Sequence, residues 1–368
     1  MWKPCFLAIL TILGTSLAQA EEPAPVLASF NDEIEKVFSL RNMGQVELTN
    51  LRGAIYVQGW ALDKIKVKAR RTVQAPNAEE AKKLFALMDF RFRTSGDDVE
   101  LSAEYGKGLD IKDRLKERGN PQTNMDITVF APSRLKLRVW ASTGAVSVKS
   151  WVGALEVRTS SGAIHVEDVR TDKISLLCPS CNISAKEVRG SIRCMGGTGK
   201  VDLSDVEGKE VYVETAAGSL NLNRIKGDQL YVSKEGWIVA KNLRGRIEFH
   251  TENGAVDIRD GYGFVSGHAE TGNIYVQMRE WHFLDKALVE SIKGNVEVAL
   301  PPKFSGEVDL WSVQGKAALD FKLQALQDAK TFGPDPLNHL RGKINEGGEQ
   351  LRVFSQGGNV KISRTTGI

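Results

Sequence analysis

The chain has little of four things that would point directly to a function: cysteine, aromatic residues, long apolar runs and an excess of one charge. It has 4 cysteines and 7% aromatic residues in 368 positions. Beyond the N-terminal segment, no stretch approaches the roughly 18 apolar residues of a membrane-spanning helix. Its 49 basic and 46 acidic residues leave a net charge of +3. Nucleic-acid-binding proteins concentrate basic residues on one face, so this balance argues against such a partner.

The scarcity of cysteine also limits redox and metal chemistry. Cys178-Pro-Ser-Cys181 has C-x-x-C spacing, which would suit a redox pair, half of a zinc site or a structural disulfide. A zinc site needs four ligands, and no second C-x-x-C or nearby histidine pair supplies them. A thioredoxin-like pair begins a helix, whereas the flanking sequence here has the pattern of short strands. We therefore predict a structural bridge at a corner of the fold, with Cys194 as a buried apolar residue.

The first twenty residues have the pattern of a signal peptide. Lys3 precedes a mostly apolar run from 6 to 17, and Ala18-Gln19-Ala20 fits a signal-peptidase site. We expect residues 1–20 to be removed and residues 21–39 to form an N-terminal linker. The mature chain would be exported, to the periplasm, the cell surface or the medium, with no transmembrane segment.

A glycine recurs about every nine residues through the middle of the chain, and each one precedes a short stretch in which apolar and polar residues alternate. Pairs of these units alternate in character, so the structural period is 18 or 19 residues. Self-similarity of this kind indicates stacked repeats. The series is Gly144, Gly153, Gly162, Gly190, Gly199, Gly208, Gly218, Gly227, Gly236, Gly245, Gly254, Gly263 and Gly272.

Alternation with a period of two is typical of strands with one buried face, and these strands are too short and too closely joined to form hairpins at every junction. We predict an all-β fold: a single-domain parallel β-solenoid of about 18-residue coils, with one short helix near the N-terminal part. Residues 40–135 would form N-terminal strands, the helix and a cap. Residues 136–323 would form regular coils, and residues 324–368 a loop and a final capping strand. Glycine at each turn fits a backbone with positive φ.

The repeat also predicts which side chains point inward. Each coil contributes a pair of aliphatic residues in one half and a further aliphatic residue at a corner. The pairs include Val146 and Val148, Ile164 and Val166, Ile183 and Ala185, Val201 and Leu203, Leu220 and Leu222, Ile238 and Ala240, Val256 and Ile258, and Ile274 and Val276. The corner residues are Trp151, Val169, Val188, Val206, Ile225 and Leu243.

The chain resembles the exported bacterial "putative adhesin" β-solenoid domains of unknown function. The resemblance rests on units such as SSGAIHVEDVR, on the PNAEEAKKL segment followed by GDDVELSAEY, and on the closing segment GKINEGGEQLRVFSQGGNVKIS. It covers roughly residues 40–368. It implies a solenoid fold and an envelope location more strongly than any ligand, because glycine and aliphatic patterns define a scaffold.

The surface offers one candidate metal site. His250 and His268 lie eighteen residues apart, and Glu252 and Glu270 follow them at the same offset. Two imidazoles and two carboxylates in one layer could hold a divalent metal, although repeated surface residues also produce such pairs by chance. We predict no other cofactor. The sequence contains no G-x-S-x-G, H-E-x-x-H or phosphate-loop pattern.

Outward aromatic residues form the candidate binding surface. Arg193, Tyr212 and Tyr231 would share one column of the second half-coil, and Trp237 and Tyr275 would lie on the other face. Such residues could contact a sugar ring or a partner protein, or they could only stabilise the sheet.

The sequence leaves three functions open. The leading hypothesis is a non-enzymatic envelope protein with an adhesin-like or scaffolding role, binding a cell-surface glycan or an envelope protein. The first alternative is a carbohydrate-active β-helix enzyme, and a metal-dependent binding module is the second. Asp202 and Asp257 should lie three coils apart, roughly 14 Å, which exceeds the carboxylate separation of about 5–9.5 Å in glycosidases.

Overall fold

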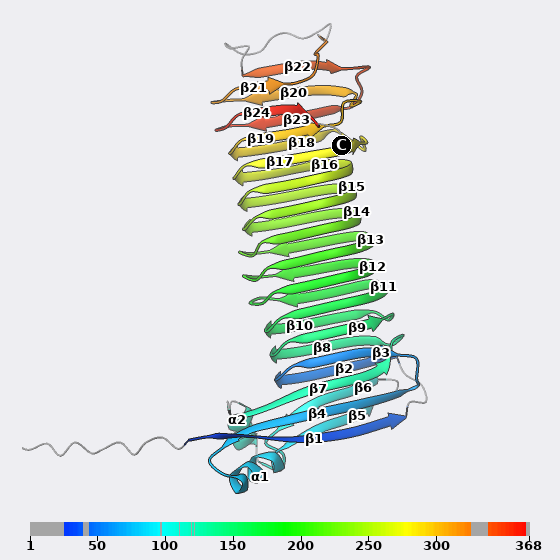
Figure 1. Cartoon of the computed structure of the whole chain (residues 1–368), viewed down its shortest axis with the longest axis vertical. Coiled ribbons are helices and arrows are strands. Elements are labelled where there is room, and N and C mark those ends of the chain that lie inside the picture. The colour runs from blue at the N-terminus through cyan, green and yellow to red at the C-terminus, as the bar shows by residue number, and fades with distance from the viewer. Residues whose placement is uncertain are drawn as a thin grey trace, which may run out of the picture.

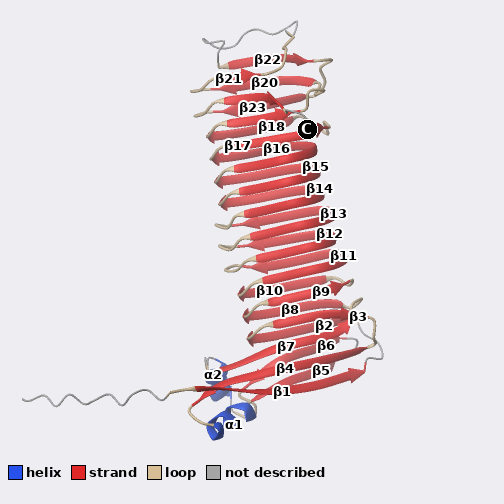
Figure 2. Cartoon of the chain, in the orientation of Figure 1, coloured by secondary structure: helices blue, strands red, loops and turns tan. Residues whose placement is uncertain are grey.

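The chain forms one tall stack of strands (Figures 1 and 2). The structure, a computed structural model, describes residues 26–39, 44–95, 98–109, 111–118, 120, 122–324 and 338–365. Strands of successive coils pair in parallel through the middle of the stack. The prediction of an all-β parallel solenoid is confirmed. The predicted signal peptide lies outside the described residues.

The N-terminal part contains both described helices. Its elements are β1 (Ala28–Ser39), β2 (Gln45–Arg52), β3 (Ile55–Trp60), β4 (Lys64–Ala75), α1 (Ala78–Ala86), β5 (Met88–Ser95), β6 (Asp98–Tyr105), α2 (Ile111–Arg118) and β7 (Thr123–Pro132). The predicted helix is α1, and the side chain of Asn77 caps it by accepting a hydrogen bond from the Glu80 N–H at 2.9 Å. The second helix, α2, was not predicted, because we expected one short helix in this part of the chain.

The regular coils run from β8 to β17, and the C-terminal part follows. The first group is β8 (Lys136–Thr143), β9 (Val146–Trp151), β10 (Leu155–Ser161), β11 (Ile164–Cys178), β12 (Ile183–Gly196), β13 (Val201–Thr215), β14 (Leu220–Glu235), β15 (Ile238–Asn253), β16 (Val256–Thr271) and β17 (Ile274–Trp281). The second group is β18 (Ala287–Lys293), β19 (Val296–Leu300), β20 (Gly306–Ser312), β21 (Ala317–Leu319), β22 (His339–Ile344), β23 (Gln350–Ser355) and β24 (Val360–Arg364).

Each regular coil has two faces and two edges. The first half of a long strand such as β11 pairs with β9 and lies on what we call the first face. Its second half pairs with β10 on the second face. The strand crosses between the faces at the bend edge, and the chain returns through a short loop at the turn edge. The two faces enclose a narrow core.

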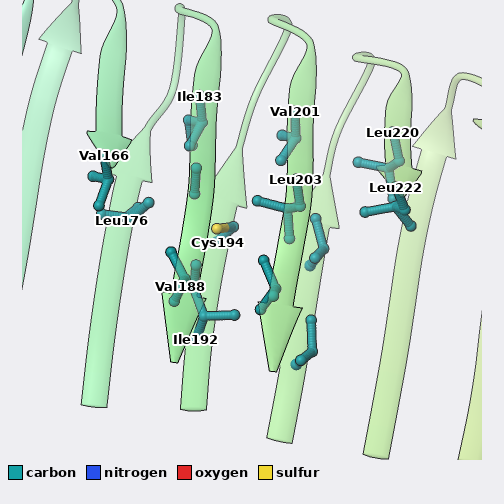
Figure 3. Close-up of a cluster of buried hydrophobic side chains, with 14 of the residues drawn as sticks. Val166, Leu176, Ile183, Val188, Ile192, Cys194, Val201, Leu203, Leu220 and Leu222 are labelled. Atoms are coloured by element: carbon teal, nitrogen blue, oxygen red, sulfur yellow. The ribbon is translucent and has the colours of Figure 1, made fainter. Parts of the chain in front are cut away.

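The core consists of the columns predicted from the repeat. All the predicted inward pairs and corner residues are at most 2% exposed. Neighbours in a column pair in register, as Ile183 does with Ile164 on one side and Val201 on the other. Figure 3 shows side chains of these columns, such as Ile183, Val201 and Leu220, at equivalent places on successive coils. Each coil therefore covers the apolar side chains of the coil before it, and a single coil could not bury them alone.

The bend edge is held by a column of residues with positive φ that are not glycine. Ser150, Asp168, Glu187, Asp205, Arg224, Asn242 and Asp260 have φ between 51° and 57°. Each lies one residue before the corner position, and in all but Asp260, which precedes Gly261, its conformation directs the next side chain into the core. This backbone conformation costs an L-residue roughly 1–2 kcal/mol, and it costs asparagine and aspartate less.

Ser150 offers a test of this backbone cost. We expect Ser150→Asn to stabilise the fold by about 0.5–1 kcal/mol, because asparagine tolerates φ near the 53° found here. The measurement is the midpoint of urea unfolding followed by circular dichroism. Ser147→Asn, in the extended part of the same strand, is the control and should give no gain. A Ser150→Asn midpoint at or below that of the wild type would contradict the explanation.

Glycine recurs at the edges mainly because stacked backbones come very close there. A Cβ on Gly218 would lie 1.8 Å from the carbonyl oxygen of Gly199, and one on Gly236 would lie 2.4 Å from that of Gly218. The expectation that positive φ explains the glycines is correct for Gly236 (φ 149°) but wrong for Gly218, which is absent from the positive-φ residues. These glycines form a ladder in which each contacts the glycine of the coil before it.

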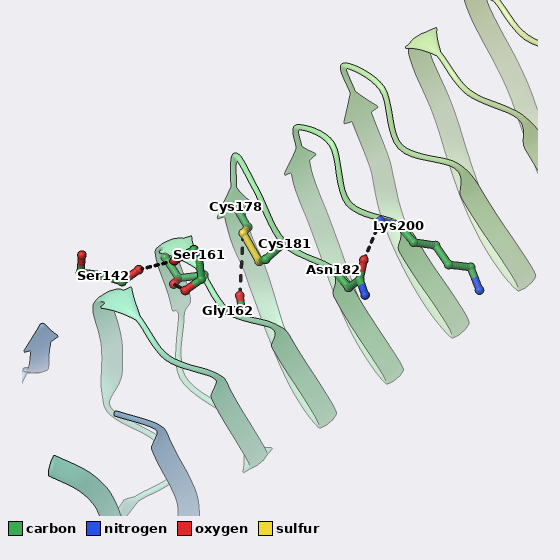
Figure 4. The surroundings of a disulfide bond; sticks show 8 residues. Ser142, Ser161, Gly162, Cys178, Cys181, Asn182 and Lys200 are labelled. Carbon is green, nitrogen blue, oxygen red and sulfur yellow. Dashed lines mark hydrogen bonds between the residues drawn. A yellow bond between two sulfur atoms is a disulfide. The ribbon is translucent and has the colours of Figure 1, made fainter. Parts of the chain in front are cut away.

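A disulfide bond occupies one step of this ladder. The structure joins Cys178 and Cys181, with their Cα atoms 5.7 Å apart, at the turn-edge loop between β11 and β12 (Figure 4). Cys181 takes a glycine position, since a Cβ on Gly199 of the next coil would lie 2.0 Å from its carbonyl oxygen. Cys178 is fully buried. The bond lies at an edge of the coil, where we predicted a structural bridge at a corner of the fold.

Cys194 is the free, fully buried cysteine of the described chain. Burial raises the pKa of its thiol to about 12, so the protonated form predominates at neutral pH. The thiolate is the nucleophile. We therefore expect iodoacetamide at mildly alkaline pH to leave Cys194 unmodified in the folded chain, and mass spectrometry to find it alkylated only after unfolding in urea. Equal labelling rates in the two states would contradict its burial.

The N-terminal end does not follow chain order. The coil made by β2 and β3 lies between β6 and β7 on one side and β8 and β9 on the other. Beyond it, β4 pairs antiparallel with both β7 and β1. The predicted linker 21–39 is therefore wrong for residues 28–39, which form β1. The charged residues between Phe30, Ile34 and Phe38 hide the strand pattern; Glu35, for example, forms ion pairs with Lys66 and Lys68 of β4.

The C-terminal end repeats this arrangement. The last strands in the chain, β23 and β24, lie between the coil β18/β19 and the coil β20/β21. The outermost strand on the second face is β22, which pairs antiparallel with β20. We predicted that residues 324–368 end in a capping strand. That prediction is wrong, because the last strands of the chain form an inner coil. The loop predicted at the start of that range includes residues 325–337, which lie outside the described residues.

Candidate binding surfaces

The predicted metal ligands are not gathered around one point. The rings of His250 and His268 stack with their centroids 5.3 Å apart. However, Nδ1 of His268 lies 2.8 Å from Oε1 of Glu290 on the next coil, and no contact joins either ring to Glu252 or Glu270. Among the residues that the structure describes, no group of three or more His, Cys, Asp or Glu side chains could hold a metal ion. The hypothesis of a metal site at these four residues is wrong.

The carboxylates of the first face are engaged by neighbours and do not form an acid pair. Asp202 accepts a hydrogen bond from Asn221 at 3.0 Å, and Asp257 forms an ion pair with Arg259 at 2.9 Å. The register places Asp202 and Asp257 three coils apart. They cannot act together on one glycosidic bond.

The prediction that Tyr231 points outward is wrong, because its side chain is fully buried. Its hydroxyl donates a hydrogen bond to Oε1 of Gln229 inside the core, at 2.6 Å. Tyr212 pairs in register with Leu230, not with Tyr231. A register shift at the bend of β13 changes the repeat spacing from nineteen residues to eighteen, so an extrapolated spacing selects the wrong residue.

The second face therefore carries a column of Arg193, Tyr212, Leu230 and Glu248, which we call the second-face column. The guanidinium of Arg193 lies 4.6 Å from the centroid of the Tyr212 ring. Burial of Tyr212 and its hydrogen bond to Glu214 raise the pKa of its phenol. Leu230 is 36% exposed and lines an open depression together with Tyr212, Glu248 and Arg246.

The first face carries a second exposed group, the first-face patch of Trp237, Val239 and Tyr275. Trp237 is 64% exposed at the turn edge and Val239 is 42% exposed two residues later. Tyr275 lies two coils beyond Val239 in the same column. The guanidinium of Arg259 lies 5.5 Å from its ring centroid. The five predicted surface residues thus divide between two faces, and one of them belongs to the core.

Sequence reasoning missed a third group, at the C-terminal end of the second face. Trp311 is 45% exposed there. Its ring centroid lies 5.3 Å from that of Phe354 and 6.1 Å from that of His339. These residues are far apart in the sequence, and only the insertion of β23 and the antiparallel return of β22 bring them together. The single signal available was the tryptophan at an outward position of GEVDLW.

Comparison with known proteins identifies a family. The family model described as Toastrack DUF4097 matches residues 92–363. No curated protein matches the chain. Among the described residues, no helix is long and apolar enough to cross a membrane.

Several solved structures resemble the chain at low identity. A "putative cell adhesion protein" from Clostridium sporogenes shares 9% identity at a TM-score of 0.20, over 91% of this chain and 100% of that one. A "putative adhesin" from Bacteroides fragilis shares 12% at 0.27, over 91% and 97%. A "putative lipid binding protein" from Parabacteroides distasonis shares 8% at 0.34, over 90% and 96%. TM-scores this low carry no functional argument.

Proposed function

The chain belongs to the Toastrack DUF4097 family, and on that premise we propose that it is an exported, non-enzymatic protein of the cell envelope. It binds a cell-surface glycan or an envelope protein through the extended faces of its solenoid, in an adhesin-like or scaffolding role. The N-terminal pattern of residues 1–20 supports the export. Cell fractionation tests that part: the chain should be recovered outside the cytoplasm and begin near Glu21.

One observation carries the proposal: aromatic side chains, of which Trp237 is exposed and Tyr212 and Tyr275 are half-buried, lie at outward positions of the in-register faces. Trp237 is 64% exposed, and Tyr212 and Tyr275 each lie beside an arginine. Aromatic residues of this kind are enriched where proteins contact partners. An enzyme site instead encloses its substrate and places two reactive groups within reach of it.

The carbohydrate-active alternative would need converging carboxylates from the irregular segments 100–125 and 277–290. In those segments Glu104 forms an ion pair with Arg91, and Glu290 contacts His268. An activity screen on glycans distinguishes this alternative from binding alone.

The test is retention of the purified mature chain on envelope material, followed by an activity screen on the retained glycans. We expect Trp237→Ser and Tyr212→Ser to weaken retention by about tenfold each, because truncating an aromatic anchor at an interface removes about 1–2 kcal/mol or more of binding free energy. Tyr56→Ser is the matched control, since Tyr56 is also exposed, at 48%, but lies at the N-terminal end of the first face. Undiminished retention of both test variants, or cleavage of a glycan, would overturn the proposal.

A further inference from the structure

The group at the C-terminal end of the second face has the composition of a binding site. We call it the terminal cluster. It consists of outward-facing side chains from three strands, β20, β23 and β22, that pair side by side. Its members are Asp309, Trp311, His339, Arg341, Arg352 and Phe354.

Trp311 is the platform of the cluster. Its side chain remains 45% exposed although it has an aromatic neighbour on either side. Phe354 meets it at an interplanar angle of 57° and His339 at 40°. Neither neighbour stacks face to face on the indole, so they support the ring without covering it.

Asp309 fixes the walls of the cluster. It lies two residues before Trp311 on the outer face, yet it is only 6% exposed because two neighbours cover it. Its Oδ1 lies 2.7 Å from Nε2 of His339, and its Oδ2 accepts hydrogen bonds from Arg352 at 3.1 and 3.2 Å. Charge-assisted hydrogen bonds of this kind hold side chains in defined positions. The groups around Trp311 are therefore preorganised.

Arg341 is the cation that the cluster leaves free. It is exposed, and no ion pair, hydrogen bond or ring contact engages it within the described chain. It pairs in register with Asp309, while His339 pairs with Trp311. Arg341 is thus the diagonal neighbour of Trp311, at a Cα separation of roughly 7–8 Å. A guanidinium on a long flexible side chain can reach a group bound over the indole from this position.

From these observations we propose that the terminal cluster binds a carboxylated sugar, a hexuronate residue of an acidic polysaccharide. The apolar face of the pyranose ring lies on Trp311, and Arg341 pairs with the carboxylate. Guanidinium groups suit this role because their planar donors match a carboxylate bidentately. This inference rests on the proposed function and assigns a ligand class to one end of the binding surface.

The size and charge of the cluster favour a sugar over a protein partner. A stable protein interface buries about 800 Å² on each partner, whereas the exposed large apolar side chains here are Trp311 and Val313. The exposed tryptophan of β8 shows the contrast. Trp140 is 43% exposed, but the guanidinium of Arg158 lies over its ring at 5.3 Å, and Arg158 is itself paired with Glu156. Arg158 is thus engaged both by the indole ring and by a carboxylate, and it differs in this from Arg341.

The experiment measures binding of oligogalacturonate to the purified mature chain by isothermal titration calorimetry. We expect wild-type binding that weakens as salt rises, because a carboxylate–guanidinium pair is screened. Trp311→Ala and Arg341→Gln should each weaken it about tenfold, the loss typical of one aromatic stack or one charge-assisted pair. Methyl-esterified oligogalacturonate, which keeps the ring and the linkage but lacks the charge, should bind the wild type about tenfold more weakly.

Trp140→Ala is the control variant and should bind like the wild type. Melting curves establish whether every variant is folded. We expect them all to fold, because the substituted side chains are exposed. Three results would overturn the inference. Trp311→Ala or Arg341→Gln could bind as tightly as the wild type, or Trp140→Ala could lose as much affinity as these variants. The wild type could also bind sulfated dextran as tightly as oligogalacturonate. If the wild type does not bind oligogalacturonate but is still retained on envelope material, this inference alone is overturned. If the wild type binds neither, the proposed function is overturned as well.

Discussion

Replacing Gly218 by valine is expected to lower the free energy of unfolding by about 3 kcal/mol or more. The reason is steric: even the first carbon of the new side chain would lie 1.8 Å from the carbonyl oxygen of Gly199 on the preceding coil. Relief would require β13 and β14 to move apart and to lose interstrand hydrogen bonds. Urea unfolding followed by circular dichroism measures the loss. Hydrogen exchange should locate it in these coils, because repeats contact only their neighbours.

Ala217→Val is the matched control for this substitution. Ala217 precedes Gly218 in the same loop but is exposed, so the added methyl groups enter solvent. We expect its unfolding midpoint to remain close to that of the wild type. If Gly218→Val were equally stable, the close approach of stacked turns could not be the reason for the glycine series.

Trp151→Ala is expected to destabilise the chain by about 3–5 kcal/mol, the range for removing a large buried aromatic side chain. Trp151 is fully buried at the corner of β9, stacked in register with Val169. Its Nε1–H donates a hydrogen bond to the carbonyl oxygen of Leu135 at 3.0 Å, so alanine would leave both a cavity and an unpaired buried carbonyl. The measurement is again the urea midpoint.

Trp237→Ala is the control for the buried tryptophan. Trp237 is 64% exposed, so its removal takes little area out of the core. We expect a change within about 0.5 kcal/mol, as for most surface substitutions. Similar losses for the two tryptophans would contradict the assignment of Trp151 to the core and Trp237 to the surface.

The regular coils could be predicted from the sequence because their information is local and repeated. An alternating pair such as Ile183 and Ala185 defines its buried face by itself, and its equivalents one period away define the stacking partner. Val201 and Leu203 pair with these residues in the predicted register. Sterics at Gly218, by contrast, depend on the separation of two coils, which the sequence does not encode locally.

Tyr231 shows where periodicity fails. The bend of β13 contains one residue more than that of β14, so the register shifts between Glu207 and Glu210. After the bend, each residue is displaced by one position from the place that a constant period predicts. A shift of one position moves a side chain to the opposite face of its strand. The apolar character of Leu230 could not correct the error, because a solenoid face also carries exposed apolar residues.

The ends could not be predicted for a different reason. The pairing of β2 with both β6 and β8, and that of β23 with both β18 and β20, joins segments out of chain order. Composition carries no signal for such an order. The same limit hid the terminal cluster, since Trp311 and Arg341 become neighbours only after β22 has returned along β20.

This order of strands has a mechanical consequence. In an ordinary stack the outermost layer can be peeled away one hydrogen bond at a time. Here the coil β2/β3 and the coil β23/β24 are each clamped between two other coils (Figure 1). A force that pulls on Gln45 and Arg364 would have to shear both neighbours of each coil simultaneously. Tension applied at these two residues would therefore be resisted by two neighbouring coils at each point.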